Sequence, residues 1–200
     1  MKKVVVTFFT VAILSATSAF AQSSPFSYSY IQAGYGSGTV DVAGVSLNTS
    51  GTSLAASVAT SEATFITGSF GNGTVKVGGI SANLDDWSIG FGGRMPLSTA
   101  TDLVGSVSYL STTLSANGGW IKETGLGLNA GVRHALGEML ELGAGAGLAI
   151  TGSERVQTTS FNFGGRFKVS NGFSIGGGYS VARNDTATSS GFGINGRLEF

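Results

Sequence analysis

Apolar residues alternate with small or polar ones at a period of two from Ser27 to the end of the chain, and the spacing of an amphipathic helix is absent. Successive side chains of a strand point to opposite faces, so this pattern predicts strands. The 33 glycines support the prediction, because each glycine destabilises a helix by about 1 kcal/mol relative to alanine. The last segment shows the alternation clearly: Phe192, Ile194, Gly196, Leu198 and Phe200 share one face, and Gly193, Asn195, Arg197 and Glu199 share the other.

The residues opposite the apolar face distinguish a membrane barrel from a soluble β-sandwich, which alternates in the same way. A solvated sheet face is rich in Lys, Glu and Thr, whereas here Gly, Ser and Asn predominate. Only 11% of the residues are charged, against about 25% in soluble proteins. We therefore predict an all-β fold, a transmembrane antiparallel up-and-down β-barrel with lipid against its apolar face and small side chains in its lumen.

Ten alternating segments can be delimited, at 27–36, 51–60, 64–73, 84–94, 102–112, 121–134, 139–150, 157–168, 173–182 and 189–200. Most match the 9–11 residues that a membrane-crossing strand needs, and an even number returns both chain ends to one side. The segment 64–73 has an uncertain facing, because Phe65 and Phe70 have opposite parity. We expect short periplasmic turns near 61–63, 96–101, 135–138 and 170–172, and longer outer loops at 37–50, 74–83, 113–120, 151–156 and 183–188.

Aromatic residues are predicted to form one belt at each membrane interface. The outer belt would contain Tyr35, Trp87, Tyr109, Trp120, Tyr179 and Phe192, and the periplasmic belt Tyr28, Phe167, Phe173 and Phe200.

The first residues have the features of a secretory signal. Lys2 and Lys3 precede an apolar run from Val4 to Ala16, and Ala19-Phe20-Ala21 is a small-x-small cleavage site. The run is shorter than the roughly 20 residues that a spanning helix needs, which argues against a retained anchor. We expect residues 1–21 to be removed and residues 22–200 to form the barrel.

A short repeat, a glycine followed closely by an arginine, ends four of the segments: Gly92-Gly93-Arg94, Gly131-Val132-Arg133, Gly164-Gly165-Arg166 and Gly196-Arg197. With the apolar–turn–apolar hairpins and the terminal Phe200, this repeat makes residues 27–200 resemble the small Gram-negative outer-membrane β-barrel superfamily, which includes OmpA-like transmembrane domains and opacity-type porin-like proteins. Many members have eight strands, so eight is the alternative to ten.

The resemblance implies a location in the bacterial outer membrane, with the lipid bilayer as the surroundings of the barrel. It also implies that the outer-membrane assembly machinery reads the last strand, through Phe192, Ile194, Leu198 and Phe200. The alternative is that Phe200 is only an interface anchor.

Parity directs the four repeat arginines into the lumen, at one level near the periplasmic mouth. Their neighbours by parity and position are one lysine and three acids, and an unpaired buried ion would be costly. We predict a layer of salt bridges and hydrogen bonds that seals or gates this end, formed by Arg94, Asp102, Arg133, Glu141, Arg166, Lys168, Arg197 and Glu199. The alternative is a constriction that mildly prefers anions. Glycines such as Gly143, Gly145 and Gly147 would leave the middle of the lumen open.

No catalytic, cofactor or metal site is predicted. The chain has no cysteine, and its single histidine, His134, has outward parity near a strand end. Equal numbers of basic and acidic residues, 11 of each, argue against a nucleic-acid partner,. We expect a monomer with a structural or passive permeability role, as a narrow pore for small solutes. The alternative is adhesion to a host surface through loops 37–50 and 74–83.

Overall fold

The structure is a computed structural model that describes residues 25–77, 80–116 and 118–200, so the predicted signal lies outside the described residues. The described residues form ten strands, and the alternative of eight is wrong. The strands are β1 (Tyr30–Val42), β2 (Val45–Ala59), β3 (Thr64–Val77), β4 (Ile80–Ser98), β5 (Thr101–Ala116), β6 (Gly119–Leu136), β7 (Leu140–Thr151), β8 (Val156–Ser170), β9 (Phe173–Arg183) and β10 (Ala187–Glu199).

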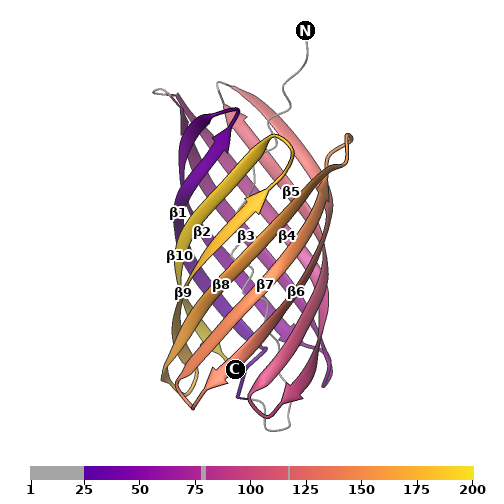
Figure 1. The fold of residues 1–200 in the computed structure, drawn as a ribbon, viewed down its shortest axis with the longest axis vertical. Helices are drawn as coiled ribbons and strands as arrows, with labels where there is room; N and C mark the ends of the chain where they lie inside the picture. Colours follow the sequence, from indigo (N-terminus) through magenta and orange to yellow (C-terminus); the bar gives the residue numbers. More distant parts are fainter. Residues whose placement is uncertain (1–24, 78–79, 117) are drawn as a thin grey trace.

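Each strand pairs antiparallel with the next in sequence, and β1 pairs with β10, so the sheet closes into a barrel (Figure 1). The closing seam runs from the pair Tyr30–Glu199 to the pair Val42–Ala187. The chain therefore closes the barrel without a second copy. Among the described residues, no helix is long and apolar enough to cross a membrane. The predicted fold class is confirmed.

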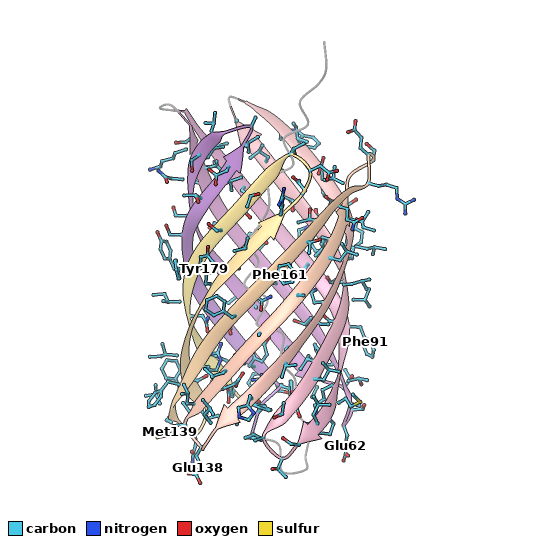
Figure 2. The ribbon with its side chains drawn as sticks, viewed as in Figure 1. Glu62, Phe91, Glu138, Met139, Phe161 and Tyr179 are labelled. Atoms are coloured by element: carbon cyan, nitrogen blue, oxygen red, sulfur yellow. The ribbon has the colours of Figure 1, made fainter. Side chains whose placement is uncertain are left out.

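The barrel wall has an apolar outside and a polar inside, as the alternation predicts. Phe192, Ile194 and Phe200 are each more than half exposed, whereas Arg197 is fully buried in the lumen. The facing of β3, which the sequence left uncertain, is set by Phe65: its ring is 0% exposed inside the barrel, and Phe70, at 52% exposure, faces outward. Figure 2 shows Phe91, Phe161 and Tyr179 on the barrel wall.

The end that carries the C-terminus and the start of β1 is called the periplasmic end below, and the opposite end the outer end. The periplasmic end is at the bottom in Figures 1 and 2, where Glu62, Glu138 and Met139 mark two of its turns.

Three of the predicted outer loops, 37–50, 74–83 and 113–120, are wrong, because the strands continue through them. The links predicted at 151–156 and 183–188 are confirmed to within one or two residues at each end. Segment 37–50 is a hairpin with the two-residue turn Ala43-Gly44, whose φ angles of 50° and 83° are both positive. This is the arrangement of a type I′ turn, which matches the twist of paired strands. Segments 74–83 and 113–120 also belong largely to strands, and the turns after β7 and β9 span only 152–155 and 184–186. The Ser, Thr and Asn side chains that suggested loops do not prevent backbone pairing.

The outer aromatic belt therefore crosses the barrel below the strand ends. The rings of Trp87 and Tyr109 lie 5.6 Å apart, and those of Tyr179 and Phe192 lie 4.6 Å apart. β1, β4 and β5 continue well past this belt, and their outward residues there are mainly polar. The barrel wall projects beyond the apolar belt at the outer end.

The first strand begins at Tyr30 rather than at residue 27, because its neighbours end there. Ser29 caps both neighbours: its carbonyl accepts a hydrogen bond from the Phe200 N–H at 3.0 Å, and its hydroxyl accepts one from the Ala59 N–H at 3.2 Å. The residues before Ser29 have no strand to pair with, and they turn into the lumen. The prediction that Tyr28 belongs to the periplasmic belt is wrong, since Tyr28 is 0% exposed inside the barrel.

Candidate functional site in the barrel lumen

Residues 25–29, called the N-terminal plug below, occupy the periplasmic mouth of the barrel. Phe26 and Tyr28 are buried there with Phe65 and Val104, and these four residues form a hydrophobic cluster inside the lumen. The rings of Phe26 and Tyr28 meet edge to face at 6.5 Å, and Tyr28 is stacked on Phe65 with the same centroid separation. The plug therefore fills the mouth with aromatic side chains.

Cationic side chains of the wall lie against the plug rings. The guanidinium of Arg133 lies 4.5 Å from the ring centroid of Phe26 and 4.8 Å from that of Tyr28, and Arg94 lies 5.5 Å from the latter. Cations at such distances are attracted by the ring faces, and more strongly when both are desolvated. These contacts join the plug to β4 and β6.

Two hydrogen bonds fix the plug further. The Tyr28 hydroxyl donates to the Asp102 carboxylate, and the Lys168 ammonium donates to the Pro25 carbonyl. Burial raises the pKa of the Tyr28 phenol above its ordinary value, so the hydroxyl stays protonated and donates,. Asp102 also accepts from Arg94, with 2.9 Å between Nη1 and Oδ2. Asp102 on β5 therefore holds the plug at Tyr28, and Lys168 on β8 holds it at Pro25.

Arg133 and Glu141 form a buried ion pair between β6 and β7. Arg133 Nε lies 2.6 Å from Glu141 Oε1, and Nη2 lies 2.7 Å from Oε2. This two-point geometry is the strongest arrangement of an arginine with a carboxylate. It neutralises the cation that lies against the rings of the plug.

The other two repeat arginines meet at an amide oxygen. Gln32 Oε1 accepts from Arg166 Nη2 at 2.9 Å and from Arg197 Nε and Nη2 at 3.0 and 2.8 Å. Arg197 also stacks on Tyr30, with its guanidinium carbon 4.0 Å from the ring centroid. Arg166 donates to Asn195 at 2.7 Å as well.

All eight residues of the predicted charge layer lie at the periplasmic mouth, but they do not form one salt-bridge network. Within the described part of the chain, the ion pairs of this layer are Arg94–Asp102 and Arg133–Glu141. Glu199 accepts from the Ser174 hydroxyl at 3.2 Å. Among the described residues, the oxygens that accept hydrogen bonds from Arg166 and Lys168 are neutral.

Two pairs of residues that organise this layer were not predicted to belong to it: Tyr30 and Gln32 on β1, and Phe26 and Tyr28 in the plug. Gln32 and Tyr30 have inward parity beside Arg197, so their position could have been found from the register of β1 and β10. Phe26 and Tyr28 gave no such signal, because they precede the first strand and follow no ladder.

Next to the charge layer and toward the outer end, the described residues enclose cavities of the lumen, two of which have a volume of about 120 Å³ each. One lies within β5–β10, at the level of Asn129, Asn162 and Asn195. The other lies nearer the outer end, within β1–β4 and β10, beside Val75, Leu84 and Asp86. The glycines do not leave the whole lumen empty, because side chains lie across some of them. A Cβ on Gly92 would stand 2.1 Å from Phe65 Cζ, and one on Gly176 would stand 3.1 Å from Arg166 Nη2.

A closed antiparallel barrel with an apolar outer belt, an aromatic girdle and a polar lumen is the architecture of an outer-membrane barrel. The chain belongs to the family of the outer membrane protein beta-barrel domain, whose family model matches residues 7–167. It is a protein of the bacterial outer membrane. No curated protein sequence matches the chain.

Solved structures with the same fold share little sequence with it. The beta domain of the Bordetella autotransporter BrkA is 12% identical, with a TM-score of 0.58, over 86% of this chain and 100% of that one. The translocator domain of the autotransporter NalP from Neisseria meningitidis is 14% identical, with a TM-score of 0.54, over 87% and 89%. Neisserial surface protein A is 12% identical, with a TM-score of 0.50, over 86% and 96%. These similarities establish the fold alone.

Proposed function

We propose that the barrel is a narrow passage for small solutes, closed at its periplasmic end by its own N-terminal plug. The observation that carries this proposal is the burial of Phe26 and Tyr28 in the mouth, against Arg133 and Arg94. The predicted charge layer serves as the seat of the plug rather than as a complete seal by itself.

The way the plug is held supports a closure that opens. Strands of the wall are joined by continuous backbone ladders, such as the seam from Tyr30 to Val42. The plug is held mainly by side-chain contacts, two of which are the hydrogen bonds of Tyr28 and Lys168. Because each such contact contributes only modestly, the plug can leave the mouth without breaking the barrel.

The space above the plug also supports a passage. One cavity lies nearer the periplasmic end and the other nearer the outer end, and the first is lined by Ser180, whose buried hydroxyl has no partner among the described residues. Buried hydroxyls of this kind are usually satisfied by water. If the lumen above the plug is hydrated, displacement of the plug is the one step needed to open a passage through the barrel.

Planar-bilayer recording of the purified protein tests the proposal. The wild-type protein is expected to show rare or no current steps, and the double variant Phe26→Ala, Tyr28→Ala frequent ones, because both plug rings are removed. Phe161→Ala is the matched control: it removes an aromatic ring that is 62% exposed on the outer wall, and it leaves the lumen unchanged.

Heat-modifiable electrophoretic mobility shows that each variant is folded. A folded double variant whose bilayers are as silent as protein-free ones would rule the passage out.

The alternative of adhesion to a host surface stays a prediction, and extended loops are not what would carry it. The segments proposed for it, 37–50 and 74–83, belong largely to paired strands, and the turn in the first consists of Ala43 and Gly44.

A further inference from the structure

The cavity within β5–β10 combines three features that together recognise an anion: a buried cation on one side, neutral amides on the walls and an unpartnered hydroxyl. It lies directly above the charge layer, and its lining includes Arg133, Glu141 and Arg166.

Glycines from several strands make the room. Gly143 and Gly145 on β7 and Gly178 on β9 line the cavity, and β6, β8 and β10 contribute asparagines to it. A Cβ on Gly145 would stand 3.2 Å from Asn162 Oδ1, so the Asn162 side chain lies over the backbone of β7 at this glycine. The asparagine side chains therefore occupy space that the glycines leave free.

Arg166 is a buried cation that has no carboxylate in direct contact among the described residues. It is 5% exposed, and within the described ranges of the chain it forms no ion pair. Its terminal nitrogens donate to Ser174, Gln32 and Asn195. A guanidinium has five N–H groups, so two remain for water or a solute. By contrast, Arg133 in the same lining is neutralised by Glu141.

The amide and hydroxyl groups of the walls add donors without charge, and the one carboxylate in the lining, Glu141, is paired with Arg133. Among the residues that the structure describes, Asn129 and Asn162 form no hydrogen bond with another side chain, and Ser180 is 7% exposed with no partner for its hydroxyl. The volume of about 120 Å³ equals the share of about four liquid water molecules. A site of this size and charge accepts a small anion and excludes a polymer or a bulky ring system.

We propose that this cavity binds a small oxyanion, the carboxylate of a short organic acid or inorganic phosphate, with its oxygens facing Arg166 and its remainder among Asn129, Asn162 and Ser180. This inference names a class of solute for the proposed passage, and it rests on that passage for the route by which the anion reaches the cavity. Hydrogen bonds from a guanidinium to an anion are stronger than those between neutral groups. Arg166 would therefore supply most of the affinity, and the neutral amides would orient the ligand.

The test is titration of the folded full-length protein in detergent micelles at constant ionic strength, by calorimetry and by NMR of the asparagine side-chain amides. The probes are acetate, inorganic phosphate and acetamide, which has the shape of acetate and no charge. Acetate or phosphate is expected to bind, and acetamide is not. The anion that binds with the higher affinity shows whether the site prefers a carboxylate or a phosphate.

Asn162→Asp supplies the decisive variant, because it places a negative charge in the cavity and leaves the hydrogen bonds of Arg166 in place. It is expected to weaken anion binding by about tenfold or more. Asn83→Asp, the same change on an exposed residue of β4 at the outer end, is the control and is expected to leave binding unchanged.

Three results would overturn the proposal: no binding of either anion, equal binding of acetamide, or equal anion affinity in Asn162→Asp. The two proposals fail separately. Lost anion binding with bilayer currents still raised by the plug substitutions removes the site alone, and anion binding with silent bilayers removes the passage alone.

Discussion

Each buried cation of the periplasmic mouth is stabilised by a different kind of partner. Arg133 contacts a carboxylate and two rings, Arg197 contacts an amide oxygen and a ring, and the described hydrogen-bond acceptors of Arg166 are neutral oxygens. Strand parity predicted that these side chains point inward, because the period of two fixes direction. It did not predict the partners, because partners come from strands far apart in sequence and from the plug.

The Arg133–Glu141 pair gives the sharpest prediction at this scale. Glu141→Gln leaves Arg133 buried without its counter-ion, which typically costs about 3–5 kcal/mol. We expect a loss of that order in the free energy of unfolding, measured by urea titration in lipid vesicles. Glu138→Gln makes the same change on an exposed residue of the adjacent turn and should cost almost nothing. Equal losses in both variants would show that the ion pair contributes nothing.

The strands themselves were largely predictable. Ten segments were expected and ten strands are present, since alternation extends over whole strands and is hard to imitate by chance. The outer ends were predicted too short, because Ser, Thr and Asn predominate where the wall leaves the lipid. In water both faces of a strand tolerate polar residues, so the sequence there lacks the contrast that lipid imposes inside the membrane.

The last strand carries a prediction about assembly. Phe200 is 71% exposed on the outward face that also holds Phe192, Ile194 and Leu198. If the assembly machinery reads this face, Phe200→Ala should slow the appearance of heat-modifiable, folded protein in the outer membrane several-fold in a pulse–chase experiment. The substitution keeps the backbone bond to Ser29.

Phe167→Ala separates this role from simple anchoring at the interface. Phe167 is an outward aromatic of β8 near the same end, 48% exposed, and it is not part of the chain terminus. Equal delays of assembly in Phe200→Ala and Phe167→Ala would show that Phe200 acts only as an interface anchor.

At the scale of the whole molecule the two ends differ. The periplasmic end is filled by the plug, and the outer end is a projecting wall with short turns. The plug was not predictable, because no ladder or repeat extends to residues 25–29. The barrel class and the location in the outer membrane were predictable, because composition, alternation and the last strand all indicated them.

Processing determines where the mature chain begins. The small-x-small motif that ends at Ala21 predicts that Gln22 is the first residue of the protein in the outer membrane. Mass spectrometry of the purified protein should give the mass of residues 22–200, and Ala21→Arg should cause an uncleaved precursor to accumulate. A mature protein that begins at Met1 would contradict the prediction.

The anchoring of Ser29 has a consequence for how quickly the mouth recloses. The plug is the direct continuation of β1, and Ser29 stays fixed to the neighbouring strands by the backbone of Phe200 and Ala59. Five residues reach at most roughly 17 Å when extended, so a displaced plug remains within that radius of its seat. Its effective concentration there is in the millimolar range that short tethers produce. If the plug opens as proposed, reclosure is intramolecular, and we expect its rate to be independent of how many copies of the protein the membrane holds.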